Sequence, residues 1–368
     1  MRSSFFAPAT TLFILVCLIP AARATAQPAP AAQAAPAAPT TPSIRLGTTI
    51  FADYTFQQQP EVKDSDGNTV NYSSFNITRA YLNVTGNISR RVAFRVTPDI
   101  VRETGVGSAL NGSYTFRLKY AYGQLNLDGW LPPGSWVRLG LQQTPWNQFV
   151  QDIYRYRFQG QQFEERDGFL ALADTGVSGR VALPGDYGDV HAGIYNGEGY
   201  RAAEVNDQKG FMVRGTVRPL PGHSTLHGLR VSGFIDRDAY TKDRDRSRNI
   251  VAVTFEHRYV HAGYTYLTAT DRPLGASEEI ESGGWSVFVT PRTSLGWEGL
   301  IRYDSVEPNN AIAAQRRKRF IGGVAYWLKP ISGVTSALLL DVDNTTFDGF
   351  SPAQPTQRRI ALHMLVQY

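Results

Sequence analysis

The chain has 368 residues, of which 42% are hydrophobic and 12% aromatic, and its formal net charge is +5. This composition is too polar for a helical membrane protein, and the small charge excess does not by itself indicate a nucleic-acid partner. The single cysteine excludes a disulfide framework and a thiolate metal site.

The N-terminus has the features of an export signal. Arg2 precedes an apolar run over residues 11–19, and small residues at 24–26 provide a cleavage site. The run is too short for a membrane-spanning helix, which needs about 20 apolar residues. We therefore expect residues 1–26 to be a removed signal peptide that takes Cys17 with it.

Pro and Ala dominate residues 27–42, which show no periodicity. We interpret this segment as a flexible or extended spacer on the periplasmic side. From residue 43 onward, apolar side chains recur at every second position, as in a strand with one apolar face. The last nine residues show this most clearly, with Ile360, Leu362, Met364 and Val366 in phase before the terminal Tyr368.

About sixteen such segments, each of roughly ten residues, can be marked in the chain. They start near Ser43, Phe75, Arg91, Tyr114, Ser135, Val177, Asp189, Gly210, Leu229, Asn249, Val260, Glu281, Leu295, Arg319, Thr335 and Gln357.

The connections between these segments alternate in length. Those after odd-numbered segments are mostly long and polar, such as 57–74 and 102–113, whereas those after even-numbered segments are mostly tight, such as 89–90 and 292–294. Long outside loops alternating with short periplasmic turns are typical of an even-stranded outer-membrane barrel. We therefore predict an all-β fold, a transmembrane antiparallel β-barrel of about 16 strands over residues 43–368, in the bacterial outer membrane.

The same alternation assigns charged side chains to the inside of the barrel. An arginine that faced lipid at mid-membrane would cost about 2 to 4 kcal/mol, so the phase of the arginines supports the register. Residues 114–126 carry apolar side chains at both parities, which leaves Arg117 and Lys119 unassigned. The candidate pore-lining, anion-attracting residues are Arg45, Arg79, Arg95, Arg138, Arg214, Arg230 and Arg302.

A sixteen-stranded barrel is wide enough for an aqueous channel, which makes diffusion of small polar solutes the expected function. The third outside loop, residues 146–176, is much the longest, and a loop of that length is either functional or disordered. It either narrows the pore or forms a solvated flap. Its candidate constriction residues are Arg155, Arg157, Glu164, Glu165 and Arg166.

Several short motifs, in order, resemble a known family. They are FNITRAY at 75–81, LGLQQTPW at 139–146, ADTGV at 173–177 and YNGEG at 195–199. Together they resemble the phosphate-selective porin O and P family over nearly all of the mature chain. The resemblance implies a sixteen-stranded porin, usually a homotrimer, with a third loop that folds inward and an arginine-lined pore that favours anions such as phosphate.

This chain also departs from the family pattern, because phosphate selectors use a lysine cluster at the constriction and few lysines are present here. The resemblance therefore implies the fold and the pore, and it does not extend to phosphate specificity. Arg79 matches a motif position, whereas the other inward arginines are assigned by phase alone.

One basic run, Arg316 to Arg319, has no acidic residue beside it in the sequence. It could draw anions to the mouth of the pore or pair with lipopolysaccharide phosphates. Nucleic acid is not expected as a partner, because no aromatic residues are interleaved with these charges.

Enzymatic functions have little support. The six histidines are scattered, and no nucleophile elbow or paired zinc spacing is present. We expect neither a cofactor nor a metal and do not expect an enzyme. Two alternatives to a porin remain: a plugged structural or adhesion barrel, which would not conduct, and a barrel hydrolase, whose activity a single Ser or His substitution would abolish.

Overall fold

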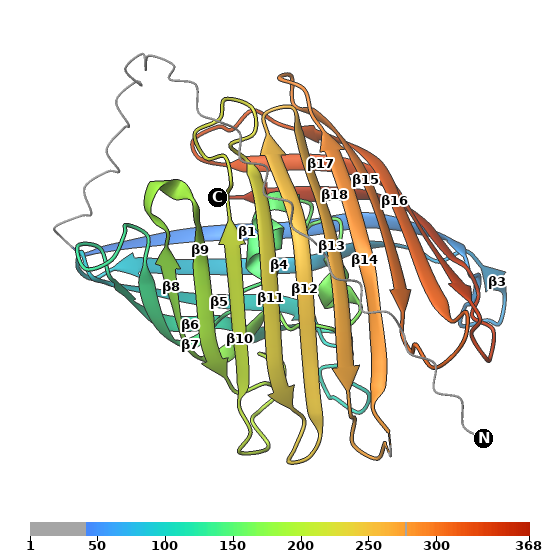
Figure 1. Cartoon of the computed structure of the whole chain (residues 1–368). Helices are drawn as coiled ribbons and strands as arrows, with labels where there is room; N and C mark the ends of the chain where they lie inside the picture. Colours follow the sequence, from blue (N-terminus) through green and yellow to red (C-terminus); the bar gives the residue numbers. More distant parts are fainter. Residues whose placement is uncertain (1–41, 277) are drawn as a thin grey trace, which may run out of the picture. The chain divides into compact units, whose positions relative to one another are not determined.

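The computed structural model describes residues 42–276 and 278–368. They form a closed antiparallel barrel of sixteen strands (Figure 1), and a small hairpin of β2 and β3 lies in the first long loop. The predicted signal peptide and all but the last residue of the predicted spacer lie outside the described residues. Within the described ranges, no helix is long and apolar enough to span a membrane.

The barrel follows the chain order, with each strand paired to the next and β1 paired to β18. Its strands are β1 (Ser43–Gln59), β4 (Ser73–Asn87), β5 (Val92–Arg102), β6 (Tyr114–Asn126), β7 (Trp136–Gln143), β8 (Ala173–Ala182), β9 (Gly188–Tyr195), β10 (Gly210–Val217), β11 (Leu229–Ala239), β12 (Asp245–His257), β13 (Val260–Asp271), β14 (Ile280–Pro291), β15 (Trp297–Glu307), β16 (Arg316–Trp327), β17 (Thr335–Asp348) and β18 (Gln357–Gln367). The remaining elements are β2 (Val62–Lys63), β3 (Thr69–Val70), α1 (Asn147–Tyr154), α2 (Phe163–Arg166) and a 3-10 turn at Pro184–Asp186.

These strands confirm the predicted fold class. The largest shifts are in β8 and β12, which begin four residues earlier than the sequence indicates, at Ala173 and Asp245. The reason is strand pairing, since Ala173 is paired with Gln143 of β7 and Asp245 with Ala239 of β11. Backbone pairing with a neighbouring strand thus extends a strand into polar sequence, where apolar and polar residues do not alternate.

The predicted alternation of faces is visible in the burial of β12. Val251 and Val253 are 58% and 46% exposed, whereas Ala252 and Thr254 between them are buried. Apolar side chains thus point outward from the sheet, and small or polar ones point into the barrel. An outward apolar surface on a closed sheet, whose backbone groups pair between neighbouring strands, suits a lipid environment.

A β-bulge explains why the face of Arg117 and Lys119 was ambiguous in the sequence. Thr97 and Pro98 of β5 are consecutive, but their partners on β6 are Tyr120 and Leu118, so Lys119 is the extra residue. An extra residue shifts the phase of the strand by one. Apolar residues therefore occur at both parities although the strand keeps one face inward.

Gly140 in β7 occupies a position where a side chain does not fit. Its φ is 122°, and a Cβ there would lie 2.3 Å from the Ala121 carbonyl oxygen of β6. Gly140→Ala is therefore expected to lower the free energy of unfolding by more than about 1 kcal/mol. The measurement is the urea concentration at the unfolding midpoint in detergent micelles. Gly215→Ala on β10 is the matched control, because nothing lies within 4 Å of its Cβ position, and equal shifts for the two variants would contradict this reasoning.

Candidate pore constriction

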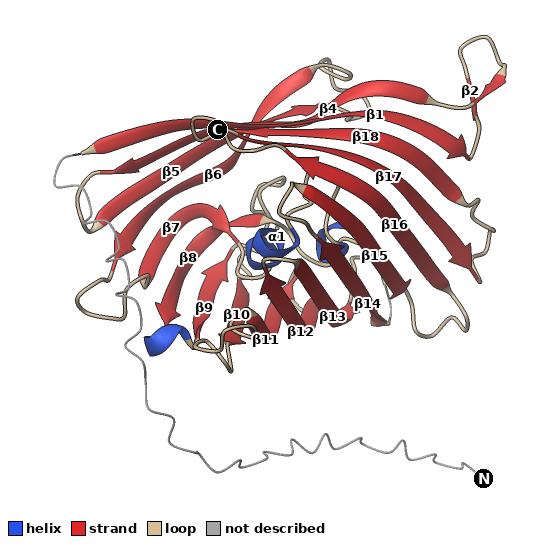
Figure 2. Ribbon diagram, turned by 90° about the horizontal axis from the view of Figure 1, so that it is seen from above, coloured by secondary structure: helices blue, strands red, loops and turns tan. Residues whose placement is uncertain are grey.

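The connection between β7 and β8, residues 144–172, lies inside the barrel, where α1 is seen within the ring of strands (Figure 2). Its two ends are tied together at the wall. The Thr144 amide donates to the Leu172 carbonyl at 3.2 Å, and the Asn147 side chain donates to the Ala171 carbonyl at 2.9 Å. α1 then contacts β12 and β13 across the interior. We refer to residues 144–172 as the inner loop.

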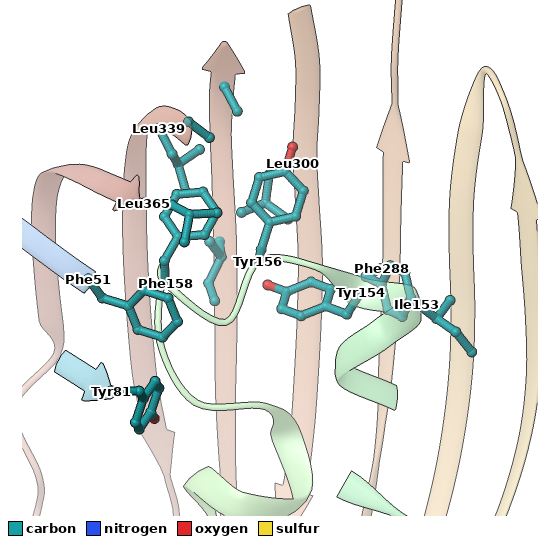
Figure 3. Close-up of a cluster of buried hydrophobic side chains, with 13 residues drawn as sticks. Phe51, Tyr81, Ile153, Tyr154, Tyr156, Phe158, Phe288, Leu300, Leu339 and Leu365 are labelled. Atoms are coloured by element: carbon teal, nitrogen blue, oxygen red, sulfur yellow. The ribbon is translucent and has the colours of Figure 1, made fainter. Parts of the chain in front are cut away.

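Two hydrophobic clusters attach the inner loop to the wall. In the first, Ile153, Tyr154, Tyr156 and Phe158 of the loop pack against inward residues of β14 to β18 (Figure 3). These wall residues include Phe288, Leu300, Ile321, Leu339 and Leu365. A wall that faces a water-filled lumen is normally polar. The apolar inner surface here is stable because the loop covers it.

The second cluster attaches the beginning and end of the inner loop. Trp146, Val150, Phe163 and Phe169 pack with inward residues of β9 to β13 and β15. The wall side of this cluster includes Tyr195, Met212, Phe234, Ile250, Leu267 and Val306. Each aromatic ring buried in this way contributes roughly 1.5 to 3 kcal/mol. Together the clusters fix the inner loop to one side of the lumen and leave the β5 to β8 side uncovered.

Arginines of the wall reinforce this attachment through loop carbonyls. Arg214 donates through Nε to the Pro145 carbonyl at 2.9 Å, and Arg248 donates to the Phe169 carbonyl at 3.0 Å. Arg302 donates through Nη1 to the Gln161 carbonyl at 3.1 Å. Tyr156 donates its hydroxyl to Glu298 at 2.9 Å. Two of the predicted pore-lining arginines, Arg214 and Arg302, therefore anchor the inner loop to the wall.

Four of the seven predicted pore-lining arginines pair with a carboxylate. Arg79 pairs with Asp99 at 3.1 Å, Arg214 with Asp189 at 2.6 Å, Arg302 with Asp304 at 2.6 Å, and Arg230 with Glu256. Arg214 and Arg302 face inward as predicted, but their side chains are only 5% and 3% exposed. Because the inner loop covers them, both are largely withdrawn from the open lumen, although Arg214 still borders a cavity that Arg138 also lines.

The buried pair at β9 and β10 allows a stability test. Asp189 accepts from Arg214 and also from Arg180, whose Nε lies 2.8 Å away. Asp189→Asn removes the carboxylate and leaves the buried Arg214 charge uncompensated, which is expected to cost about 3 to 5 kcal/mol. The measurement is the temperature of prior heating at which the protein no longer migrates as a compact folded barrel on a denaturing gel. Asp186→Asn is the control, because the Asp186 side chain is 71% exposed where it pairs with Arg218. Equal losses would contradict the role of burial.

Three cations on the uncovered wall have no ionic partner among the described residues. Arg95 donates to Asn83 at 2.8 Å and Arg138 to Gln124 at 2.7 Å, both neutral amides. Lys119, which the bulge turns inward, donates to the Tyr81 hydroxyl at 3.0 Å. We refer to Arg95, Lys119 and Arg138 as the cationic wall.

Aromatic rings support the same three side chains. The Arg95 guanidinium lies 4.6 Å from the Tyr120 ring centre, Lys119 lies 4.2 Å from that of Tyr81, and Arg138 lies 3.8 Å from that of Trp136. Rings and amides hold a cation in place through cation–π contacts and hydrogen bonds without cancelling its charge. No carboxylate therefore cancels the charge of the cationic wall, although Lys119 is only 4% exposed and acts through the cavity that it borders.

The cationic wall lines two cavities at the end of the barrel that carries the short turns. One, of about 450 Å³, is bordered by Arg95 and Lys119; the other, of about 400 Å³, is bordered by Arg138. Gln148 and Asp152 of α1 border both. A solute at this end would meet the cationic wall on one side. On the other side it would meet Gln148 and Asp152 and, in the first cavity, also the ion-paired Arg155 and Arg157 of the inner loop.

A second group of charges lies towards the end with the long loops. Asp99 pairs with both Arg79 and Arg117, the latter at 2.8 Å. Glu165 of the inner loop pairs with Arg157 at 2.9 Å and lies 3.5 Å from Arg201. The Tyr200 hydroxyl joins the two sets, since Arg117 and Arg201 each lie 3.4 Å from it. Four guanidinium groups thus share two carboxylates, which leaves an excess of positive charge.

The predicted constriction residues lie in different parts of the barrel. Arg157 and Glu165 belong to the group just described, and Arg155 pairs with Glu298 at 3.2 Å. Arg166 reaches the opposite side of the loop, towards Asp343. Glu164 does not line the lumen, because its side chain is buried and accepts a hydrogen bond from Trp146 Nε1 at 2.8 Å. Burial raises the pKa of this carboxyl, although the Trp146 hydrogen bond opposes the shift.

Sequence reasoning missed Lys119, Arg117 and Arg201 as lumen cations. The bulge hides the first two, and the third lies in a loop outside the strand pattern. Arg45 faces inward by phase, is exposed on β1 near its start, and has no ion pair among the described residues. One signal was present in the sequence, since apolar residues at inward positions, such as Leu300 and Leu339, indicate that something covers that wall.

The basic run at the start of β16 has acidic neighbours in the structure that its sequence does not show. Each member has an acidic partner in space. Arg316 pairs with Glu307, Arg317 with Asp167, Lys318 with Asp348 at 2.7 Å, and Arg319 with Asp343. The sequence places no acid beside this run, but neighbouring strands and the inner loop bring acids to it in space. A lipopolysaccharide contact here stays a prediction.

Over the residues that the structure describes, no group of three or more His, Cys, Asp or Glu is arranged to hold a metal ion. No protein-family model matches the sequence, and no curated protein does.

Solved structures do match over most of the chain. The anion-selective porin from Comamonas acidovorans has 11% sequence identity and a TM-score of 0.60, over 89% of this chain and 100% of that one. OmpT, an outer membrane protein of Vibrio cholerae in its trimer form, has 13% identity and a TM-score of 0.56 over 89% and 100%. The outer membrane channel DcaP of Acinetobacter baumannii has 12% identity and a TM-score of 0.55 over 89% and 98%. The chain thus has the fold of bacterial outer-membrane porins, while the phosphate-selective family stays a prediction.

Proposed function

We propose that this protein is a diffusion porin of the bacterial outer membrane that prefers small anions. The observation that carries the proposal is a set of lumen cations that have no ionic partner in the described part of the chain. They are Arg95, Lys119 and Arg138, on the wall that the inner loop leaves uncovered. The similarity in fold to porins, one of them described as anion-selective, supports it.

The charge distribution supports a preference rather than a binding site for one solute. The cationic wall lies at the turn end, and the group around Asp99 and Glu165 adds a further excess of guanidinium groups towards the other end. Both raise the local concentration of anions along the path and lower that of cations. Small anions, phosphate among them, are the proposed solutes, and no chemical step on the solute is proposed.

A homotrimer is part of this proposal. The support is the trimer form of one similar structure, together with an outer surface whose apolar side chains can meet either lipid or another barrel. Cross-linking of the protein in native membranes, followed by gel electrophoresis without heating, tests it. A ladder ending at three copies is the expected result, and a single band at one copy would contradict the trimer.

The test of the proposed function is the zero-current potential of the purified protein in a planar bilayer under a potassium chloride gradient. An anion-selective potential is expected, with partial block when phosphate is added. A zero or cation-selective potential would keep the porin and remove the anion preference. Absence of conductance would favour a plugged barrel.

A further inference from the structure

A cluster of arginines lies on the side of the inner loop that faces β15 to β18. Asp343 of β17 pairs with Arg319 and with Arg359 at 3.0 Å, and Arg166 at the end of α2 lies 4.0 Å from the same carboxylate oxygen. The Asp343 side chain is only 2% exposed. Three guanidinium groups from two strands and the loop thus share one buried carboxylate.

The neighbouring pairs do not balance this excess. Arg302 holds Asp304 with two hydrogen bonds, at 2.8 and 2.6 Å, and Arg317 pairs with Asp167. The five guanidinium groups of the cluster therefore face three carboxylates, which leaves two positive charges in excess. Burial, with Arg319 and Arg302 nearby, lowers the pKa of Arg166 well below its ordinary value. Like charges that are held together and partly removed from water are stabilised by a compensating anion.

Hydrogen-bond donors of the cluster are also without partners. Arg166 Nη1, Arg319 Nε and Arg359 Nε are buried and have no hydrogen-bond partner among the described residues. A buried donor left unpaired costs about 1 to 3 kcal/mol, and more when it is charged. These three N–H groups come from the three parts of the molecule that meet at Asp343.

Space for a ligand adjoins these donors. A cavity of about 310 Å³ is bordered by Arg166, Arg317 and Arg319, and a second one of about 290 Å³ is bordered by Arg319 and Arg359. The two share Arg319, Thr345 and Gln357, so they adjoin. Neither shares a lining residue with the two cavities that the cationic wall borders.

We propose that a small oxyanion, with inorganic phosphate as its representative, binds between α2 and strands β16 to β18 and ties the inner loop to the wall. Guanidinium groups match the oxygens of such an anion with paired, charge-assisted hydrogen bonds. The anion is a structural ligand at this site rather than a solute in transit. The inference does not depend on the ion preference of the pore.

A lipid phosphate would have to bind other members of the same basic run. Successive residues of β16 face opposite sides of the sheet. Arg317 and Arg319 face inward, where they meet Asp167 and Asp343, whereas Lys318 is 40% exposed and pairs with Asp348. Lys318→Gln is therefore a matched control, since it removes a cation beside Arg319 on the other face.

The experiment is isothermal titration of inorganic phosphate into the full-length protein, free of lipopolysaccharide, in detergent micelles at constant ionic strength. Saturable binding at one site per chain is expected for the wild type and for Lys318→Gln. Affinity is expected to fall by roughly tenfold or more in Arg166→Gln and Arg319→Gln, as the loss of one charge-assisted hydrogen bond predicts. Retained compact mobility on unheated gels shows that each variant is folded.

Three outcomes would overturn the inference. They are no saturable binding to the folded wild type, equal affinity in all variants, and a loss confined to Lys318→Gln, which would move the site to the outer, lipid-facing surface. Hydrogen exchange gives a second readout. Phosphate is expected to slow exchange of the Arg166 amide, which donates to the Gln162 carbonyl at 2.9 Å, in the wild type and not in Arg359→Gln. Equal slowing in both would again contradict the proposed site.

Discussion

Replacing Arg95, Lys119 and Arg138 together by Gln is expected to abolish the anion preference of the pore. These cations have amide, hydroxyl and aromatic partners but no carboxylate among the described residues, so no ion pair cancels their charge. A unit charge at about 4 Å contributes roughly 1 kcal/mol even in water, or about fivefold in local ion concentration. Glutamine keeps most of the hydrogen bonds and removes the charge.

The measurement is the zero-current potential in a potassium chloride gradient, which should fall to near zero or reverse while conductance persists. The control is the double variant Arg230→Gln and Glu256→Gln, which removes an ion pair from the same lumen without changing its net charge. Its potential should match the wild type. An unchanged potential in the triple variant would show that selectivity arises elsewhere, for instance at the group around Asp99 and Glu165.

The second large effect is expected from detaching the inner loop. Tyr156 and Phe158 are 0% and 3% exposed, stack on each other with ring centres 5.7 Å apart, and both contact Trp327. Replacing a buried aromatic residue by alanine costs about 3 to 5 kcal/mol. The double variant Tyr156→Ala and Phe158→Ala should therefore release the middle of the loop from β14 to β18.

Single-channel conductance should rise and fluctuate in this variant, because the loop no longer holds one position in the lumen. The barrel should persist, since its strands are held by backbone pairing that the loop does not supply. Phe75→Ala is the control, an aromatic residue on the outer face of β4 with 84% exposure. Unchanged conductance in the double variant, with the barrel folded, would show that the remaining contacts suffice to hold the loop.

The inner loop and the cationic wall occupy opposite sides of the same lumen. The inner loop fills the β10 to β18 side of the lumen through its apolar clusters, and the path that remains runs beside β5 to β7. Most predicted pore arginines lie in ion pairs, and two of them, Arg214 and Arg302, lie beneath the loop. An arginine on the inner face of this barrel is thus not equivalent to available charge.

Strand number, strand order and the outward face were predictable from the sequence. Alternation of apolar and polar side chains is a local property, because every second residue of a strand faces the same way wherever the strand lies. Val251 and Val253 illustrate this, since their neighbours alone identify them as outward. The lengths of the connections then give the order of neighbouring strands, which only requires that each strand pair with the next.

Charge pairing and the position of the inner loop were decided by the tertiary structure. The acids that meet Arg316 to Arg319 come from β15, β17 and the loop, up to 150 residues away in sequence. Lys119 turns inward because of a bulge that depends on pairing with β5. The alternation of side chains determined the wall of this protein, whereas contacts between distant segments determined which of its charges a solute can reach, because Coulomb energy and burial depend on distance in space.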